Sequence, residues 1–364
     1  MINTYGKTLS IDRKNILNTK IIDQSTAAEL SDGQIELSIQ SFALTANNVT
    51  YAITGDQIGY WKFFPLNHDQ GIVPVWGFAV VSASKNTQIA LGDRYYGFFP
   101  LAEKLIVEPD RITSIGFVDA AAHRKDLPAV YNHYSQVNDD EIAGLEPLQP
   151  LLMPLFATSW LIQDFLLDNE YFEAEQIIIG SVSSKTGYGL AKYLSENRPN
   201  CPKIVGLTSQ GNAGFVESLN VCDHIVTYDK VEDEILLKKS VFVDMAGNTY
   251  VRRVLHFHLK DKMVYSCAVG MSHWDKFAPS GEMPGAKPQF FFAPSQIAKR
   301  HNDWGRGVVQ TKINEAWARL AIESREWMNV VKSHGMESAR DLFVEMANGK
   351  VSPKEGHFVS LSND

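Results

Sequence analysis

The sequence predicts an α/β protein of two domains, in which an antiparallel β-barrel is followed by a doubly wound parallel sheet. Its 364 residues are too many for one comfortable hydrophobic core. Residues 1–125 contain short strand patterns separated by regular turn signals, which is typical of a small barrel. Beyond residue 150 strand and helix patterns alternate, which indicates parallel strands with helices on both faces.

The first domain is expected to cover residues 1–150. Residues 35–39 alternate between apolar and polar side chains, as in a half-buried strand. Further strands of this domain are predicted at residues 73–81 and 92–97. The acidic run at residues 138–141 and the three prolines that follow it predict the crossing into a second domain.

The second domain is expected to cover residues 151–334, beginning with a helix at residues 155–167. The alternating elements after it are strands at residues 177–179, 203–207, 224–228, 240–245 and 263–268, and helices after Gly187 and at residues 213–219, 231–237 and 250–257. An apolar stripe through residues 313–331 predicts one helix that ends at Gly335. A helix at residues 338–347 and a strand at residues 357–361 follow, and residues 335–364 are expected to complete the barrel.

The most informative stretch is residues 176–194, where a buried strand, a short polar turn and a helix follow one another. The first N–H groups of a helix have no partner within the helix, and they attract phosphate. We therefore expect a nucleotide site at this turn. Its predicted residues are Ser181, Ser183, Ser184, Lys185, Thr186 and Gly187.

Two alternatives to a dinucleotide site are open at this turn. Only Gly187 remains of the three glycines that a dinucleotide fingerprint normally carries, so an ordinary strand-to-helix connection without a ligand also fits. The end of a Walker-type phosphate loop resembles Ser184, Lys185 and Thr186. That loop requires a glycine where this chain has Ile179.

Composition and charge exclude several function classes. A net charge of -8 argues against a nucleic-acid partner, which needs a basic face. We expect no membrane helix, because no apolar run approaches the roughly 20 residues that span a bilayer. The start of the chain lacks the apolar core of a secretion signal, and the three cysteines are widely spaced. These features predict reduced thiols and a cytoplasmic location.

Several segments occur in an order that is similar to one enzyme superfamily. They are FALTANNVTYAITGD, PVWGFAVV, GDRYYGFFP, PLFATSW, IIIGSVSSKTG, VFVDMAG, CAVG, FFFAPS and NGKVSPKEGHFVSL. The chain resembles the medium-chain dehydrogenase/reductase superfamily, and most closely its zinc-free quinone-oxidoreductase branch. The resemblance implies a GroES-like barrel domain and a Rossmann nucleotide-binding domain. It also adds Thr158, Met245, Gly247 and Gly270 to the expected cofactor site.

We expect no metal site. Zinc members of the superfamily carry an early cysteine and a Gly-His-Glu sequence in the barrel domain. This chain has no cysteine before Cys201, and residues 75–78 stand where the histidine and glutamate would be. His256 and His258 alternate as if on one face of a strand, but no third ligand accompanies them.

The cofactor is expected to be NADP(H) rather than NAD(H). Enzymes that prefer NAD carry an acidic residue about 20 positions after the last glycine, where it binds the ribose 2′-hydroxyl. Residues 205–213 of this chain contain no acid. Thr208 and Ser209 in that stretch would tolerate a 2′-phosphate, and Lys185 would supply a counter-charge.

The resemblance implies hydride transfer to a small apolar or aromatic carbonyl substrate, such as a quinone or an α,β-unsaturated carbonyl compound. Tyr51 is the expected proton donor, with Asn48 to orient it, and Tyr60 is the alternative acid. Two other functions are considered. One is a dinucleotide-binding sensor or scaffold without turnover, and the other is a non-redox enzyme with the same fold. The resemblance also implies a possible homodimer, with residues 262–268 as its edge strand or as a plain interior strand.

Overall fold

The chain forms two compact units in the computed structural model. The first consists of Met1–Leu151 with Met328–Asp364, and the second of Leu152–Trp327. The structure describes residues 4–24, 29–67, 69–138, 144–269, 283–305 and 307–361.

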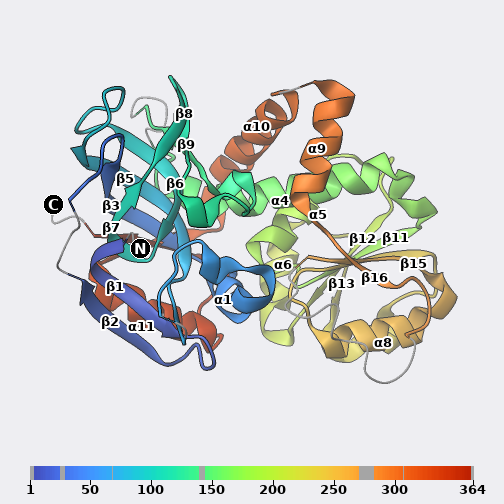
Figure 1. Ribbon diagram of the computed structural model, residues 1–364. Coiled ribbons are helices and arrows are strands. Elements are labelled where there is room, and N and C mark those ends of the chain that lie inside the picture. The colour runs from blue at the N-terminus through green and yellow to red at the C-terminus, as the bar shows by residue number, and fades with distance from the viewer. Residues whose placement is uncertain are drawn as a thin grey trace. The chain divides into compact units, whose positions relative to one another are not determined.

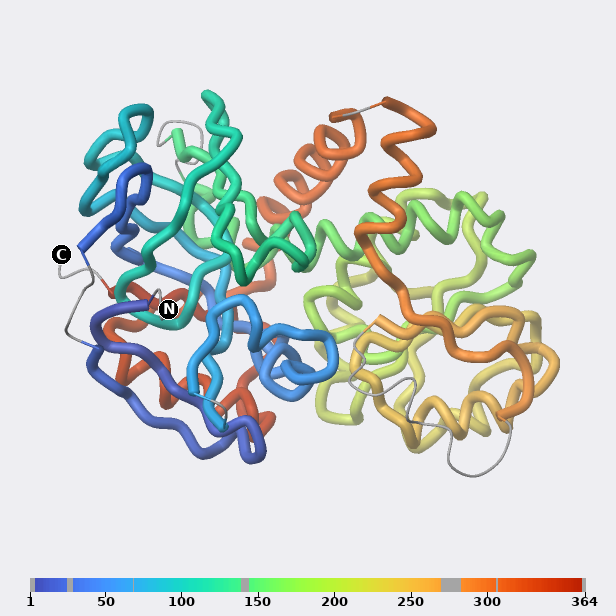
Figure 2. Tube along the Cα trace, in the orientation of Figure 1, coloured from blue at the N-terminus to red at the C-terminus, as the bar shows by residue number. Residues whose placement is uncertain are grey.

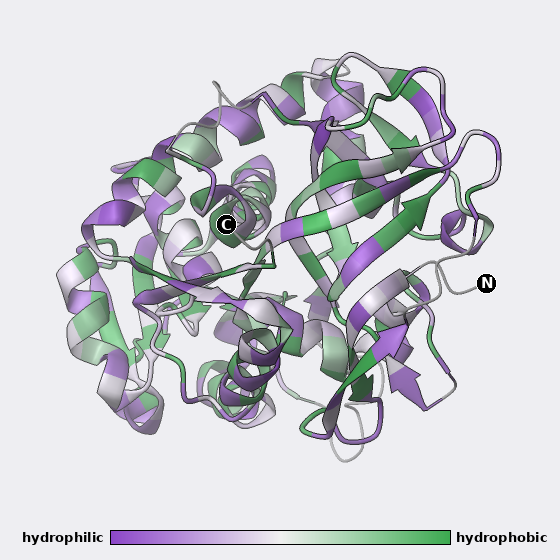
Figure 3. Ribbon diagram, turned by 90° about the vertical axis from the view of Figure 1, so that its left-hand side faces the viewer, coloured by the Kyte–Doolittle hydropathy of each residue, from purple (hydrophilic) through white to green (hydrophobic). Residues whose placement is uncertain are grey.

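The first unit is built on one large sheet, in which the order of the main path is β2-β1-β7-β3-β5-β6-β10-β9-β8. Its strands are β1 (Thr4–Asp12), β2 (Thr19–Gln24), β3 (Ile35–Leu44), β4 (Gln70–Gly71), β5 (Pro74–Ser84), β6 (Arg94–Pro100), β7 (Ala102–Val107), β8 (Pro109–Thr113), β9 (Gly116–Asp119), β10 (His133–Gln136), β17 (Asn329–His334) and β18 (Glu355–Ser360). The pairs on this path are antiparallel, which confirms the predicted sheet type. Figure 3 shows hydrophobic colouring along much of this sheet.

The C-terminal segment returns to the first unit, where the red end of the trace runs beside the blue beginning (Figure 2). Strand β18 pairs with β3, and helix α11 (Gly335–Ala347) packs against β1 and β2 (Figure 1). Met336, Ala339 and Phe343 of α11 join the barrel core. The other helices described in this unit are short, namely α1 (Ala46–Ile53) and α2 (Gly55–Ile58), with 3-10 turns η1 (Tyr60–Lys62), η2 (Ala122–Arg124) and η3 (Ala129–Tyr131).

The second unit contains a six-stranded parallel sheet with the order β13-β12-β11-β14-β15-β16. Its strands are β11 (Gln176–Gly180), β12 (Lys203–Thr208), β13 (His224–Thr227), β14 (Ser240–Asp244), β15 (Met263–Ala268) and β16 (Pro288–Phe290). This is the strand order of a doubly wound dinucleotide-binding sheet, so the predicted fold class is confirmed. The strand order reverses between β11 and β14, and ligands of such sheets bind outside the carboxyl ends of the strands at that position.

Helices cover both faces of the parallel sheet (Figure 1). The described helices of this part of the chain are α4 (Leu148–Asp168), α5 (Lys185–Ser195), α6 (Ala213–Leu219), α7 (Val231–Glu234), α8 (Thr249–Leu259), α9 (Ala293–Trp304) and α10 (Val308–Glu323). Side chains from α7 and α8 pack on one face, against Ile178 of β11 and Phe242 of β14. The β-branched run of β11 is fully buried, which is why it lacks alternation.

The structure corrects the prediction for the C-terminal stripe. Helix α10 ends at Glu323, and Val331 lies in strand β17, which pairs in parallel with β18. Gly335 has a φ of +84° and begins α11 instead of ending a helix. Apolar spacing over a few residues does not separate the last turns of a helix from a following strand, which is the reason for the error.

Helix α4 also differs from its prediction, because it begins at Leu148 rather than near residue 155. Pro150 lies in its first turn, where no backbone donor is needed, and Pro154 lies inside the helix. Among the described residues α4 is the one helix that is long and apolar enough to cross a membrane. Its apolar window is 56% buried in the structure, and core helices of soluble proteins pass the same test.

Strand β15 pairs with β14 on one side and β16 on the other. The segment at residues 262–268 is therefore an interior strand, and the suggestion that it forms the edge of a dimer is wrong. Within the described part of the parallel sheet the edge strands are β13 and β16. The short β16 was not predicted as a strand because Pro288 and three consecutive phenylalanines show no alternation.

Candidate functional site

The turn between β11 and α5 has the geometry of a phosphate-binding corner, although serines have replaced most of its glycines. Ser181 follows β11 with a φ of +53°, a conformation that usually requires glycine. Its hydroxyl lies 3.1 Å from the hydroxyl of Tyr228, at the end of β13. This hydrogen bond links the turn to a second strand of the sheet.

Gly187 is essential to the corner because α5 passes very close to the turn. A Cβ atom at this position would lie 2.5 Å from the carbonyl oxygen of Ser181 and 2.8 Å from the Cα of Val182. The surviving glycine is therefore the one that permits close packing of the helix on the strand and turn. Backbone atoms surround it, so a side chain there could not simply rotate away.

The first turn of helix α5 presents backbone N–H groups beside the turn. Ser184 is the N-cap of α5, and its Oγ accepts the N–H of Gly187 at 3.1 Å. The N–H groups of Lys185 and Thr186, in the first two helical positions, have no carbonyl of their own helix to bond. Lys185 adds a positive charge at the same end, where the helix dipole also favours an anion.

The carboxyl end of β12 supplies neutral polar groups beside the turn. The hydroxyl of Ser183 accepts hydrogen bonds from Thr208 Oγ1 at 3.1 Å and from Asn212 Nδ2 at 3.4 Å. The hydroxyl proton of Ser183 is therefore left to donate to a further group. Thr208 is fully buried, so its side chain supports Ser183, whereas Ser209 is exposed.

The carboxyl end of β14 carries a buried ion pair. Asp244 Oδ2 accepts hydrogen bonds from Arg252 Nε at 3.0 Å and Nη2 at 2.6 Å, and both side chains are almost fully buried. Asp244 Oδ1 accepts the N–H of Gly247 at 2.8 Å. The carboxylate thus holds the loop that contains Met245 and Gly247, and Met245 itself is half-buried.

The remaining predicted cofactor residues are Thr158 and Gly270. Thr158 on α4 is half-buried, and its hydroxyl donates to the carbonyl of Pro154 at 2.9 Å. Gly270 lies outside the described residues. Sequence reasoning missed Ser159, which is fully buried and donates to the carbonyl of Thr186 at 2.8 Å, so that α4 supports the first turn of α5.

In the first unit, Tyr51 lies on α1 and is 4% exposed. Asn47 donates a hydrogen bond from Nδ2 to the Tyr51 hydroxyl at 2.9 Å, as residues four apart on a helix can do. Asn48 is instead committed to the backbone, because its Oδ1 accepts the N–H of Thr45 and its Nδ2 donates to Pro74. The expectation that Asn48 orients Tyr51 is wrong, because the side chain that bonds the Tyr51 hydroxyl is that of Asn47.

Tyr51 belongs to a cluster of aromatic rings in the first unit. We define the aromatic cluster as Tyr51, Tyr60, Phe63, Trp76, Phe98 and Tyr131. The ring centroids are 4.3 Å apart for Tyr51 and Tyr60, and 4.6 Å apart for Phe98 and Tyr131. The hydroxyls of Tyr60 and Tyr131 are 3.4 Å apart. The structure thus brings the two predicted tyrosines together and adds Tyr131, which sequence reasoning missed.

Two glycines hold the turn that carries Tyr60. Trp61, the next residue in η1, is 5% exposed and lies against Gly55 and Gly71. A Cβ atom at either glycine would lie 2.2 Å from an atom of the indole ring. Because the indole fills this space, η1 is fixed and the phenol of Tyr60 faces Tyr51.

The phenols of the aromatic cluster are protonated at neutral pH. Burial raises the pKa of Tyr51 well above 10, and the neighbouring Tyr131 raises it further. Burial likewise raises the pKa of Tyr60 well above 10. Burial also raises the pKa of Tyr131, although its hydrogen bond with Tyr60 acts in the opposite direction. These hydroxyls are therefore neutral hydrogen-bond donors.

The described residues contain no group of three or more His, Cys, Asp or Glu side chains that could hold a metal ion. His256 and His258 lie on helix α8, where residues two apart face different directions, so a shared strand face was the wrong expectation. His256 bonds the carbonyl of Pro284 and the hydroxyl of Ser266, and His258 bonds the carbonyl of Ile235. Both histidines therefore have structural partners.

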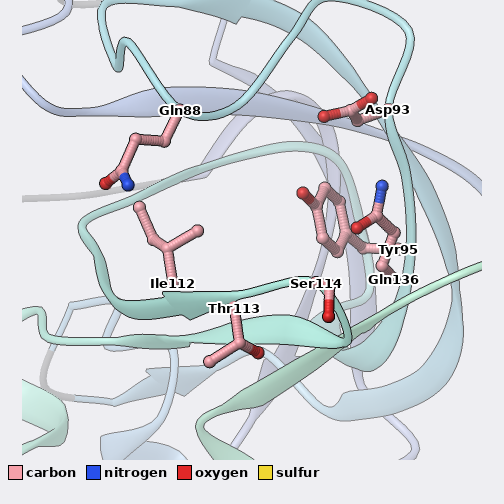
Figure 4. Close-up of a pocket in the computed structure, with 7 residues that line it drawn as sticks. All are labelled: Gln88, Asp93, Tyr95, Ile112, Thr113, Ser114 and Gln136. Atoms are coloured by element: carbon pink, nitrogen blue, oxygen red, sulfur yellow. The ribbon is translucent and has the colours of Figure 1, made fainter.

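A separate pocket of about 390 Å³ opens in the first unit (Figure 4). Its lining is mostly polar and consists of Gln88, Asp93, Tyr95, Ile112, Thr113, Ser114 and Gln136. Tyr95 packs on Phe117, whereas the next residue of β6, Tyr96, stacks on Trp76 of the aromatic cluster. None of the predicted site residues lines this pocket, and its polarity does not suit an apolar substrate.

Comparison with known proteins agrees with this architecture. A family model described as "Protein of unknown function (DUF2855)" matches residues 42–352. No curated protein matches the chain. Among solved structures, CurA from Vibrio vulnificus in complex with NADPH is 12% identical with a TM-score of 0.63, and the match covers 99% of this chain and 100% of that one.

Two further structures have the same fold. The yhdH oxidoreductase from Salmonella enterica in complex with NADP is 15% identical with a TM-score of 0.53, over 98% of this chain and 100% of that one. The quinone oxidoreductase from Coxiella burnetii is 12% identical with a TM-score of 0.52, over 98% of this chain and 99% of that one. These likenesses confirm the predicted fold of an antiparallel barrel domain joined to a doubly wound parallel-sheet domain.

Proposed function

The chain belongs to the DUF2855 family, and we propose that it is a zinc-independent, NADPH-dependent oxidoreductase that reduces a quinone or an α,β-unsaturated carbonyl compound. The observation that carries this proposal is the corner between β11 and α5. There, the first N–H groups of helix α5, the side chain of Lys185 and the hydroxyl of Ser183 lie at the carboxyl end of a parallel strand. Such a corner suits a pyrophosphate.

The residues of the corner fit a dinucleotide. The N–H groups of Lys185 and Thr186 would donate to the pyrophosphate, and the close approach of α5 at Gly187 keeps them at the edge of the sheet. When bound, NADPH would supply the hydride. CurA and yhdH, which share this fold, were solved with NADPH and NADP respectively, and this supports the proposed cofactor.

Preference for the 2′-phosphate follows from the end of β12. No acidic residue occurs at positions 205–213, so nothing there would repel a phosphate. Ser183, Ser209 and Asn212 offer neutral donors, and Lys185 offers a charge. The same residues would not select the free 2′-hydroxyl of NADH, because that selection requires a carboxylate acceptor.

The aromatic cluster suits the acceptor. Flat, mostly buried rings favour a planar apolar molecule, and the protonated phenols of Tyr51 and Tyr60 would donate to its carbonyl oxygen. A quinone and an enone both present such an oxygen. We assign proton donation to these phenols, with Asn47 orienting Tyr51.

The direct test is NADPH oxidation by the purified protein over a panel of quinones and enones, together with thermal unfolding in the presence of NADPH. A nucleotide at a hundred times its Kd stabilises the folded protein by about 2.7 kcal/mol. Stabilisation with oxidation supports a reductase, and stabilisation without oxidation on any acceptor indicates a sensor or scaffold. The absence of stabilisation by NADPH or NADH would favour a non-redox enzyme and contradict the proposal.

The proposal also covers the oligomeric state of the protein and its cellular compartment. We expect a cytoplasmic enzyme that acts without a nucleic-acid or membrane partner. A homodimer would form through β16, the edge strand next to β15, because an exposed edge offers unpaired backbone groups to a second copy. Light scattering measures the oligomeric state, and a monomer would exclude the dimer.

A further inference from the structure

We propose that Tyr131 forms a proton-donating pair with Tyr60 and that the buried Arg124 is the residue that positions it. This inference rests on the proposed reductase function and extends it, because it adds Tyr131 to the phenols that supply the proton of the reaction. It concerns two residues that neither the sequence motifs nor the comparisons mark.

Tyr131 occupies the centre of the aromatic cluster. Its ring centroid lies 4.6 Å from that of Phe98 and 5.2 Å from that of Phe63, and its hydroxyl lies 3.4 Å from the hydroxyl of Tyr60. One phenol of the pair donates to the other, so the pair keeps one proton for a third group. The Tyr131 residue is also partly exposed, unlike Tyr51, which would allow solvent to return a proton to the pair.

Arg124 fixes the backbone that carries Tyr131. Its side chain is 1% exposed and donates from Nη2 to the Tyr131 carbonyl oxygen and from Nε to Asn132 Oδ1. Nη1 donates to Asp119 and to the Tyr134 hydroxyl, at 3.0 Å and 2.8 Å. The planar guanidinium thus binds three groups of residues 131–134 in a single orientation, which a lysine cannot do.

The proton balance needs no reagent beyond those of the proposed reaction. NADPH, when bound, would supply the hydride, and Tyr60 would donate its proton to the developing oxyanion or enolate of the acceptor. Tyr131 then gives its proton to the Tyr60 oxygen, and solvent returns a proton to Tyr131. The sum is one NADPH and one proton consumed for each acceptor reduced, with every phenol restored.

The test uses a probe of the donor pair that does not depend on turnover. p-Nitrophenolate is a planar oxyanion whose binding is followed by its visible absorbance. We expect wild type to bind it and Tyr131→Phe to bind it roughly tenfold more weakly, because a hydrogen bond to a charged group is lost. Tyr95→Phe is the matched control, because it removes a phenol from the same unit but lines the separate pocket, and its affinity for the probe should stay within about twofold of that of wild type.

Arg124→Lys tests whether Arg124 positions Tyr131, because lysine keeps the positive charge but lacks the planar guanidinium and its several N–H donors. We expect Arg124→Lys to lower the affinity for p-nitrophenolate about as much as Tyr131→Phe does. The double variant should bind the probe no more weakly than either single variant, since Arg124 acts through Tyr131. Equal binding by wild type and Tyr131→Phe, or no binding by either, would overturn the inference even if Arg124→Lys fails to fold. NADPH oxidation by wild type, measured in parallel, reports separately on the proposed function.

Discussion

Replacing Gly187 by alanine tests the corner between β11 and α5 directly. The new Cβ atom would lie 2.5 Å from the Ser181 carbonyl oxygen and 2.8 Å from the Val182 Cα, and both neighbours are backbone. Helix α5 must then move away from the turn. Overpacking of this kind costs about 1–3 kcal/mol, which outweighs the gain of up to about 1 kcal/mol in helix propensity.

We expect Gly187→Ala to lower the Tm by about 2–8 °C, for a net cost of about 1–2 kcal/mol in a unit of this size. The same shift moves the N–H groups of Lys185 and Thr186 away from the phosphate, so NADPH should bind at least about tenfold more weakly, as lost charge-assisted hydrogen bonds imply. Thermal unfolding followed by circular dichroism gives the first quantity, and quenching of intrinsic fluorescence by NADPH gives the second.

Gly214→Ala is the matched control, because Gly214 lies in helix α6 of the same unit and an added Cβ would meet nothing within 4 Å. It should leave NADPH affinity unchanged and stabilise the protein by about 0.5 kcal/mol. If Gly187→Ala matches this control in both Tm and NADPH affinity, a Cβ atom fits at position 187. That result would refute the claim that α5 packs too closely on Ser181 and Val182 for any residue but glycine.

Three further predictions concern charge. Arg252→Met leaves Asp244 buried without its cation and should destabilise the protein by about 3–5 kcal/mol in urea denaturation, whereas Arg340→Met at an exposed pair should change stability by less than about 1 kcal/mol. An equal effect of the two variants would contradict this distinction. Lys185→Ala should weaken NADPH binding about tenfold more than NADH binding, since only NADPH carries the 2′-phosphate; equal losses in titration calorimetry would exclude Lys185 as the counter-charge of that phosphate. Burial lowers the pKa of His256 below its ordinary value of 6.5, so the unfolded chain binds a proton there more readily than the folded one. The contribution of neutral His256 to the stability of the folded protein is therefore present above pH 6.5 and is lost as the pH falls through the folded-state pKa. The Tm of His256→Gln should therefore decrease less than that of wild type between about pH 7 and pH 5.

Much of the architecture was predictable because its causes are local. The apolar run of β11, the polar turn and the helix after it follow from neighbouring residues, and β15 and α6 have the bounds that periodicity predicts. The tail was not predictable in this way. Val331 lies in a strand because β18, far along the chain, supplies its partner, and no local pattern contains that information.

The residues of the candidate site likewise fall into those that local sequence patterns predicted and those that depend on long-range contacts. Sequence patterns identified the corner at Ser181 and Gly187 and the two tyrosines of the barrel unit. They could not indicate that Asn47 rather than Asn48 contacts Tyr51, because capping and side-chain contact compete at adjacent helical positions. They also could not indicate Tyr131, which lies 71 residues from its partner Tyr60.

By itself, then, the sequence determined the two kinds of sheet, the strand–turn–helix corner and the absence of an acid at residues 205–213. Only the tertiary structure decided which glycine the corner requires, which hydroxyls face one another and which charges are buried together. The physical reason is that backbone conformation responds to side chains a few residues away, whereas a hydrogen bond or a steric clash requires two groups that the whole fold brings to within about 3 Å.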